Sequence, residues 1–152
     1  MLSFIIPPDH VWRHFSGSDT SGSIFYAKTP SEFLTYAATE FPDVFRQAHT
    51  DPLDGRKRLS FKAGHDIGLC NVIAFDDLTS DEAKLITEEE RDGTIVKVFY
   101  TDKQFPTREF QIILGSDNTV ITMFPGPMAP PLPKNGEFSA FWDSHIFIKS
   151  KP

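Results

Sequence analysis

Hydrophobic and polar residues follow a helical pattern in the stretch that ends at residue 42. Thr29-Pro30-Ser31-Glu32 is followed by apolar residues at spacings of three and four, which places them on one face of a helix. Thr29 suits the N-cap, Pro30 suits the first helical position, and Glu32 completes a capping box. The pattern therefore predicts a helix that begins at Pro30 and ends or kinks at Pro42. Its apolar residues are Phe33, Leu34, Ala37, Ala38 and Phe41.

After the turn at 51–55 the pattern changes to the alternation of polar and apolar residues that is typical of strands. Between the early and late strands, Thr79 and Glu82 form a second capping box, which predicts a helix that ends near Asp92 and Gly93. A polar loop at 115–118 has the composition of a hairpin connection between the last two strands. The predicted strands cover 58–62, 69–75, 94–100, 108–114 and 119–124.

These elements predict one α+β domain over residues 1–152, with N-terminal helices packed on a twisted antiparallel sheet of four to five strands. The C-terminal half reads as an antiparallel meander. Residues 1–28 are expected to be irregular, and 125–136 form a proline-rich arm that cannot enter a central strand. The apolar stretch 137–148 is expected to pack back as a short helix or an edge strand.

Composition and charge exclude several classes of protein. Hydrophobic residues make up 39% and charged residues 24% of the 152 residues, which is ordinary for a globular chain and excludes wholesale disorder. Cys70 is the single cysteine, so an intramolecular disulfide is excluded. The net charge of −6 argues against binding of nucleic acid over the whole surface. It allows a local basic groove, for which Arg56, Lys57, Arg58 and Lys62 are the candidates if they form one positive patch.

Nothing in the sequence predicts a membrane segment. The apolar run at the N-terminus is short, has no basic residues before it and stops at Pro7 and Pro8, so it does not resemble a signal peptide. No later stretch approaches the ~18 apolar residues of a membrane span. We therefore expect a protein without a membrane partner that is cytoplasmic, or that is delivered into a target cytoplasm as a toxin.

No cofactor or metal is expected, because the chain contains no phosphate-binding loop, dinucleotide fingerprint or His-Glu-x-x-His motif. His10 and His14 are four residues apart and would share a helical face, but no third zinc ligand is evident. Cys70 lies in an apolar stretch without a basic neighbour, which favours a buried and unreactive thiol over a nucleophile.

His65 is the candidate for acid–base chemistry. It lies in the turn Gly64-His65-Asp66, next to a carboxylate that could orient it and just after the basic strand. A loop histidine without a chemical role remains the alternative. In the last two strands, alternation places Thr122 and Phe124 on one face, while Arg108 lies in phase with Phe110.

The runs 107–114 and 118–125, joined by a short polar turn, resemble the terminal hairpin of barnase/EndoU/colicin/RelE-like ribonuclease toxin domains. The resemblance covers roughly residues 56–125 by architecture and only this hairpin by pattern. It implies that Thr122 is a phosphate-contacting or catalytic residue and that Phe124 contacts the substrate. It also makes Arg108 a candidate for stabilising the charged phosphorane. His65 has no position in the family's pattern and is a candidate only because of its own chemistry.

Two functions therefore stay open. The first is a metal-independent endoribonuclease of bacterial toxin type, in which His65, Arg108 and Thr122 are catalytic and Arg58, Lys62 and Phe124 bind RNA. The second is a non-catalytic protein-interaction module, such as an immunity, adaptor or phage-type protein, with an inhibitor or another protein as partner. The ribonuclease site requires Arg108 and Thr122 on the same sheet face, which a regular hairpin does not give without a bulge or a shifted turn.

Overall fold

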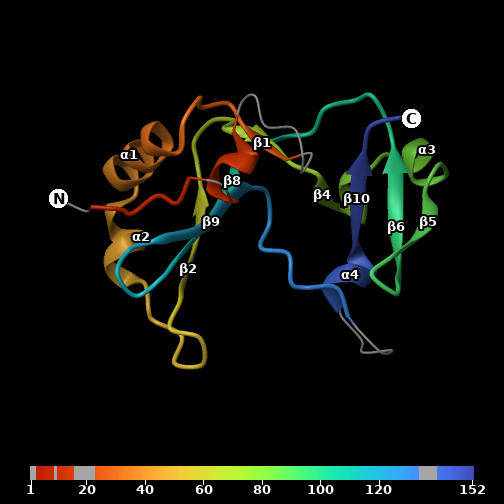
Figure 1. Cartoon of the computed structure of the whole chain (residues 1–152). Helices are drawn as coiled ribbons and strands as arrows, with labels where there is room; N and C mark the ends of the chain where they lie inside the picture. The colour runs from red at the N-terminus through yellow and green to blue at the C-terminus, as the bar shows by residue number, and fades with distance from the viewer. Residues whose placement is uncertain (1–2, 9, 16–22, 134–139) are drawn as a thin grey trace.

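The computed structural model describes residues 3–8, 10–15, 23–133 and 140–152, and its elements gather in two lobes (Figure 1). The first lobe contains the 3-10 helix η1 (His10–His14), α1 (Pro30–Glu40), α2 (Pro42–Gln47), β2 (Lys57–Lys62), β8 (Glu109–Leu114) and β9 (Val120–Pro125). The second contains β4 (Val72–Ala74), η2 (Phe75–Asp77), α3 (Ser80–Ala83), β5 (Thr87–Arg91), β6 (Thr94–Tyr100), α4 (Ala140–Ser144) and β10 (His145–Lys149). A small sheet is built from β1 (Ile24–Phe25), β3 (Gly68–Leu69) and β7 (Pro106–Thr107).

The predicted N-terminal helix is confirmed as α1. The side chain of Thr29 accepts a hydrogen bond of 3.1 Å from the backbone N–H of Glu32, and Pro30 occupies the first turn. Such a cap typically stabilises a helix by about 1 kcal/mol. Pro42 begins α2 immediately after α1 has ended, as the absence of its N–H requires.

The first lobe is held together by aromatic rings between the helices and the antiparallel sheet β2-β8-β9. Phe110 of β8 is fully buried and stacks on Phe61 of β2 with ring centroids 4.5 Å apart. Phe33 of α1 meets the same ring edge-on at 4.7 Å. Each aromatic pair of this kind adds about 1 kcal/mol beyond its buried area, so the high phenylalanine content is used to join helices to sheet.

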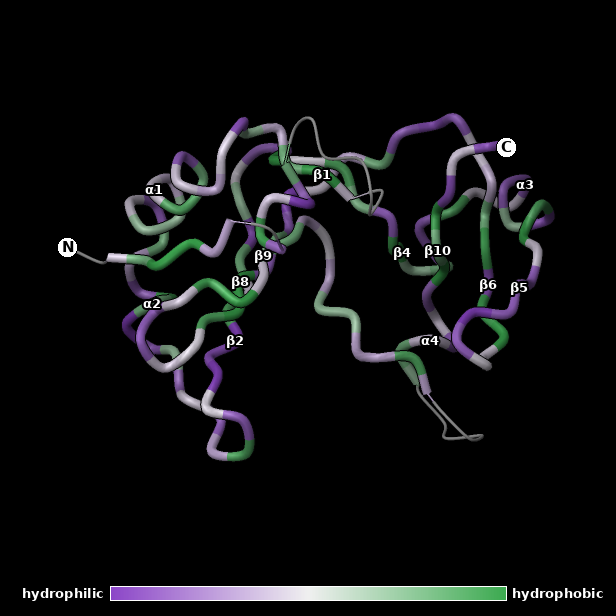
Figure 2. The backbone as a smooth tube through the Cα atoms, in the orientation of Figure 1, coloured by the Kyte–Doolittle hydropathy of each residue, from purple (hydrophilic) through white to green (hydrophobic). Residues whose placement is uncertain are grey.

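The second lobe is a four-stranded mixed sheet in the order β4-β10-β6-β5. β10 pairs antiparallel with β4 and parallel with β6, so it is an inner strand. Figure 2 shows hydrophobic residues along β6 in this lobe and along β8 and β9 in the other. One sheet face carries Ile73, Phe99 and Ile146, and the other carries Val72, Val98 and Phe147, together with Trp142 from α4.

The α+β class is confirmed, but the strands divide among three sheets instead of forming one. The predicted strand 69–75 is interrupted at 70–71, where the chain leaves the first lobe; Leu69 belongs to β3 and Val72 to β4. The stretch 137–148, of which 137–139 lie outside the described residues, forms α4 followed by the inner strand β10, so the expected edge position is wrong.

The predicted helix after the second capping box is also too long. The box itself is confirmed between Thr79 and Glu82, but α3 ends at Ala83. Residues 87–91 form β5 instead, because Asp92 and Gly93 take positive φ angles of 51° and 81° and turn the chain into a hairpin with β6. Pairing with β6 therefore overrides the helix propensity of a glutamate-rich segment.

The proline-rich arm is attached to the second lobe, but it begins one residue later than predicted, because Pro125 is the last residue of β9. It has no helix or strand from Gly126 onward, and 134–136 lie outside the described residues. The indole N–H of Trp142 donates hydrogen bonds to the carbonyls of Pro130 and Pro131 at 3.1 and 3.3 Å, and Leu132 packs on the Phe147 side of the sheet. No helix in the described part of the chain is long and apolar enough to cross a membrane.

Candidate functional site

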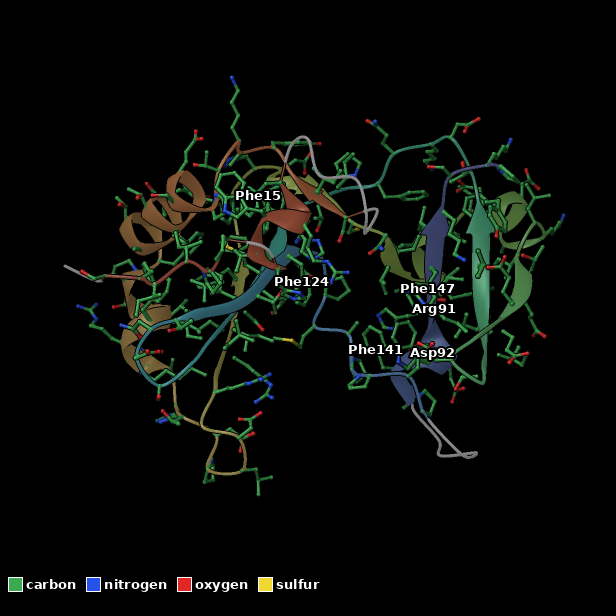
Figure 3. The ribbon with its side chains drawn as sticks, viewed as in Figure 1. Phe15, Arg91, Asp92, Phe124, Phe141 and Phe147 are labelled. Atoms are coloured by element: carbon green, nitrogen blue, oxygen red, sulfur yellow. The ribbon has the colours of Figure 1, made fainter. Side chains whose placement is uncertain are left out.

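A cleft of about 730 Å³ lies between the two lobes. One wall comes from η1 and β9 of the first lobe, and the other comes from β4, the end of β5 and β10 of the second. Figure 3 shows Phe124 in one lobe and Phe147 with Arg91 in the other. A volume of this size accommodates a ligand as large as a nucleotide.

The geometry of η1 places His10 and Arg13 together on the cleft wall. A 3-10 helix has three residues per turn, so residues i and i+3 project from the same side. His10 and Arg13 line the cleft, whereas Val11 is fully buried in the core of the first lobe. The Nε of Arg13 is buried and has no hydrogen-bond partner among the described residues. Because Arg13 as a whole is partly exposed and lines the cleft, its guanidinium offers donors to an anionic ligand there.

His14 lies at the back of the cleft and is uncharged at neutral pH. Its side chain is 8% exposed, and its Nδ1–H donates a hydrogen bond of 2.9 Å to the carbonyl of Ser23. Burial lowers the pKa of His14 to about 4, against the opposing effect of that hydrogen bond. His14 therefore adds no charge to the cleft at neutral pH, and its ring supports Phe124 at a centroid distance of 6.1 Å.

Thr122 and Phe124 reach the cleft because of the register of β9. A β-bulge between Ile113 and Leu114 shifts the pairing, so that Ile113 lies opposite Thr122 and Gln111 lies opposite Phe124. The alternate residues, Phe110, Ile112 and Met123, are fully buried in the core. Thr122 and Phe124 are half-buried on the other face of the sheet, where they line the cleft.

The cleft is basic although the protein is acidic. Its lining contains four Arg and Lys side chains and one carboxylate, Asp102. Two of the cations are paired: Lys149 with Glu89 at 2.8 Å and Lys103 with Glu82 at 3.1 Å. Within the described ranges, Arg13 and Arg91 have no ion pair. Each lobe thus presents one unpaired guanidinium to the cleft.

The structure does not bring His65, Arg108 and Thr122 together. Arg108 lies just before β8, in phase with the core residue Phe110, and forms an ion pair of 3.6 Å with Asp66. The bulge that the ribonuclease site required is present and shifts the register by one residue, but Thr122 pairs with Ile113, so Arg108 stays out of phase with Thr122. His65 is exposed, and its ring lies 5.7 Å from the ring of Tyr36 on α1. Thr122 and Arg108 therefore line different clefts, and His65 lines neither of them.

The predicted RNA-binding residues are also separated. Lys62 and Arg108 line a second cleft of about 560 Å³, which also contains Asp66, Asp77 and Glu109 and is therefore mixed in charge. Arg58 forms ion pairs with Asp51 and Asp54 of the preceding loop, which hold the pKa of Asp54 below its usual range. Strand alternation turns Lys57 to the face opposite to Arg58 and Lys62. The basic cluster at 56–62 is thus not one free positive patch.

Sequence reasoning missed Arg13 and Arg91. The pair His10 and His14 was interpreted at α-helical spacing, whereas the 3-10 geometry groups His10 with Arg13. The sequence predicts a helix at Arg91, and no local pattern places Arg91 beside β10, which begins more than 50 residues later. Among the described residues, no group of three or more His, Cys, Asp and Glu side chains is arranged to hold a metal ion.

Cys70 lines both clefts but is not arranged as a nucleophile. It is 9% exposed, and burial raises the pKa of its thiol to about 11. The S–H group lies 3.6 Å from the carbonyl of Phe105 and donates to it. A protonated thiol is a poor nucleophile at neutral pH.

Comparison with known proteins yielded no match for this chain among family models, curated proteins or solved structures.

Proposed function

We propose that this protein binds RNA in the cleft between its lobes and cleaves it as a metal-independent endoribonuclease. One observation carries the proposal: in a protein of net charge −6, a cleft of about 730 Å³ is lined by Arg13 and Arg91, which have no ion pair among the described residues, and by Thr122 and Phe124. Arginine is the residue best suited to phosphate oxygens, because its planar fork donates several hydrogen bonds at once. Aromatic rings beside cations are typical of surfaces that bind single nucleic-acid strands.

The chemistry assigned to the cleft is transfer of a phosphodiester to the neighbouring 2′-hydroxyl. His10, which is exposed on the cleft wall, takes the proton of the 2′-hydroxyl as its oxygen forms a bond to phosphorus. The bond from phosphorus to the 5′-oxygen breaks, and that oxygen takes up a proton from water. Arg13 and Thr122 donate to the non-bridging oxygens, on which negative charge builds up in the transition state. The products are a 2′,3′-cyclic phosphate and a free 5′-hydroxyl.

The test uses a 5′-labelled single-stranded oligoribonucleotide, incubated with the purified protein in excess EDTA. The proposal expects cleavage products that end in a 2′,3′-cyclic phosphate, and no cleavage of the matching DNA, which lacks the 2′-hydroxyl. Arg13→Ala is expected to slow cleavage about 100-fold, the usual loss when one charge-stabilising donor is removed. Arg46→Ala is the matched control, because Arg46 lies on α2 outside this cleft and forms an ion pair with the exposed Asp43.

Binding and cleavage are measured separately, so each part of the proposal can fail by itself. RNA binding without cleavage would remove the enzyme and leave an RNA-binding protein. Absence of both would favour the alternative proposal, a protein-interaction module whose partner is an inhibitor or another protein. As a ribonuclease the protein would act in a cytoplasm, either that of its own cell or that of a target cell.

A further inference from the structure

Arg91 lies over an aromatic ring on the wall of the second lobe. Its guanidinium carbon lies 4.5 Å from the centre of the Phe147 ring. Behind Phe147, the indole of Trp142 is stacked at 4.8 Å with an angle of 22° between the rings. The Trp142 N–H is fixed by its hydrogen bonds to the carbonyls of Pro130 and Pro131. The order of the stack is thus Trp142, Phe147, Arg91.

The backbone restricts Arg91 as well. It is the last residue of β5, where it pairs with Thr94 just before the tight turn at Asp92 and Gly93. Phe147 belongs to β10, which is paired on both sides, and only 8% of its side chain is exposed. The guanidinium of Arg91 therefore lies over Phe147 on one side, while Arg91 itself remains exposed and lines the cleft. The side turned away from Phe147 is available to a planar ligand.

We infer that an unpaired nucleobase stacks on this face of Arg91, so that the RNA bound in the cleft is single-stranded. The inference rests on the proposed function and adds to it the form of the RNA that is recognised. Bases of single strands stack on arginine planes and aromatic rings in RNA-binding proteins. In an A-form duplex the bases stack on one another, and the major groove is too deep and narrow for a side chain to reach a base face. A duplex therefore offers phosphates, 2′-hydroxyls and base edges to Arg91, but no base face within the helix.

Phe124 provides a second planar surface in the same cleft. It comes from the opposite lobe, is half-buried, and lies against the ring of His14 (Figure 3). With Arg13 on the same wall, the first lobe offers a phosphate donor next to an aromatic ring, and the second offers a cation that is itself a stacking surface. Each wall of the cleft thus carries one surface on which a base of a bound strand can stack.

The test compares three ligands that carry the same number of phosphates per strand: a single-stranded oligoribonucleotide, its abasic counterpart, and its duplex. Binding is measured by fluorescence anisotropy at one fixed salt concentration in EDTA. Each strand carries a 2′-deoxynucleotide at the cleavage position, so that it is bound but not cleaved. The single strand is expected to bind at least about tenfold more tightly than either the abasic strand or the duplex. This comparison uses the native protein and depends on no variant.

Arg91→Lys then separates stacking from charge, since lysine keeps the positive charge but has no planar group. It is expected to weaken binding of the base-bearing strand about tenfold and to change binding of the abasic strand less than twofold. Arg46→Lys is the control outside the cleft. A 2-aminopurine base in the strand should lose fluorescence on binding to the native protein and lose less with Arg91→Lys.

The outcomes separate this inference from the proposed function. Equal affinity for the three ligands, or an Arg91→Lys effect of the same size on the abasic strand, would overturn base stacking and leave RNA binding in the cleft intact. Failure of all three ligands to bind would overturn both.

Discussion

Gln111 lies opposite Phe124 in the β8–β9 pair, and this pairing decides which side chains share a surface. The amide of Gln111 is buried, accepts a hydrogen bond of 2.6 Å from the Ser60 hydroxyl and donates one of 3.0 Å to the carbonyl of Gly126. These bonds hold the register at the point where the proline-rich arm begins. As a result Thr122 and Phe124 face the cleft, while Arg108 is in phase with the core residue Phe110.

Thr122→Val should therefore reduce RNA cleavage, whereas Arg108→Ala should not. We expect Thr122→Val to lower the cleavage rate at least about tenfold, because it removes a hydroxyl donor from the cleft and keeps the side-chain shape. Arg108→Ala removes an exposed ion pair of 3.6 Å, which is worth at most about 1 kcal/mol of stability, and should change the rate less than twofold. A larger loss in Arg108→Ala than in Thr122→Val would contradict the site described here.

The buried His14 should make the protein less stable in acid. Its pKa is about 4 in the folded protein and about 6.5 when the chain is unfolded, so the unfolded state binds the extra proton between these values. The free energy of unfolding should fall by up to about 1.4 kcal/mol per pH unit as the pH drops from 6.5 to 4. This contribution is absent above pH 6.5.

His14→Gln isolates the effect, because glutamine donates a hydrogen bond but does not titrate. Urea unfolding between pH 7.5 and 4 should show a weaker dependence on pH for this variant than for the native protein. His65→Gln is the control, since His65 is exposed. If the native protein and His14→Gln lost stability in parallel, His14 would not be a buried neutral residue.

Gly68→Ala should destabilise the small sheet that connects β1 and β3. A Cβ at Gly68 would lie 2.5 Å from the carbonyl oxygen of Ile24 and 3.0 Å from the Cα of Phe25, so one of the two backbones must move. We expect a loss of about 1–3 kcal/mol in the free energy of unfolding. Gly64→Ala, with no atom within 4 Å of the added Cβ, is the matched control and should change stability by less than about 1 kcal/mol. Equal losses would show that β1 and β3 do not pack this closely.

Cys70 should resist alkylation in the folded protein. Its thiol is buried and its pKa is raised to about 11, so the reactive thiolate is scarce at pH 8. Iodoacetamide labelling at pH 8, followed by mass spectrometry, should be slow in buffer and rapid in urea. The unfolded sample serves as the control for reagent activity. Fast labelling without urea would mean that the junction at 70–71 opens readily.

Local signals in the sequence predicted the elements whose partners are close by. Thr29 and Pro30 define the start of α1 through their own backbone groups, and the hairpin at 115–118 is set by its turn residues. Thr122 and Phe124 were placed on one face by alternation alone. The position of β5 depends instead on β6 and on Lys149, which pairs with Glu89. Local sequence patterns do not indicate contacts between residues that are so far apart in the chain.

The cleft itself could not be predicted, because its walls come from segments far apart in the chain. Arg13 and Arg91 are separated by more than 70 residues, and their proximity depends on how the two lobes are joined at 70–71, 101–105 and 126–131. Arg56, Lys57 and Arg58 suggest a basic groove because their charges are adjacent in the sequence. The neutralisation of Arg58 by Asp51 and Asp54 follows from the folding of the loop between α2 and β2.

Because β10 is an inner strand, the sheet of the second lobe cannot form completely until β10 has been synthesised. β4 and β6 are made long before residues 145–149, and until these emerge from the ribosome the strands that will flank β10 have no partner between them. Unpaired strand edges attract other chains. A nascent chain that stalls before β10 would thus expose two such edges, and the cleft would lack part of one wall until β10 has paired.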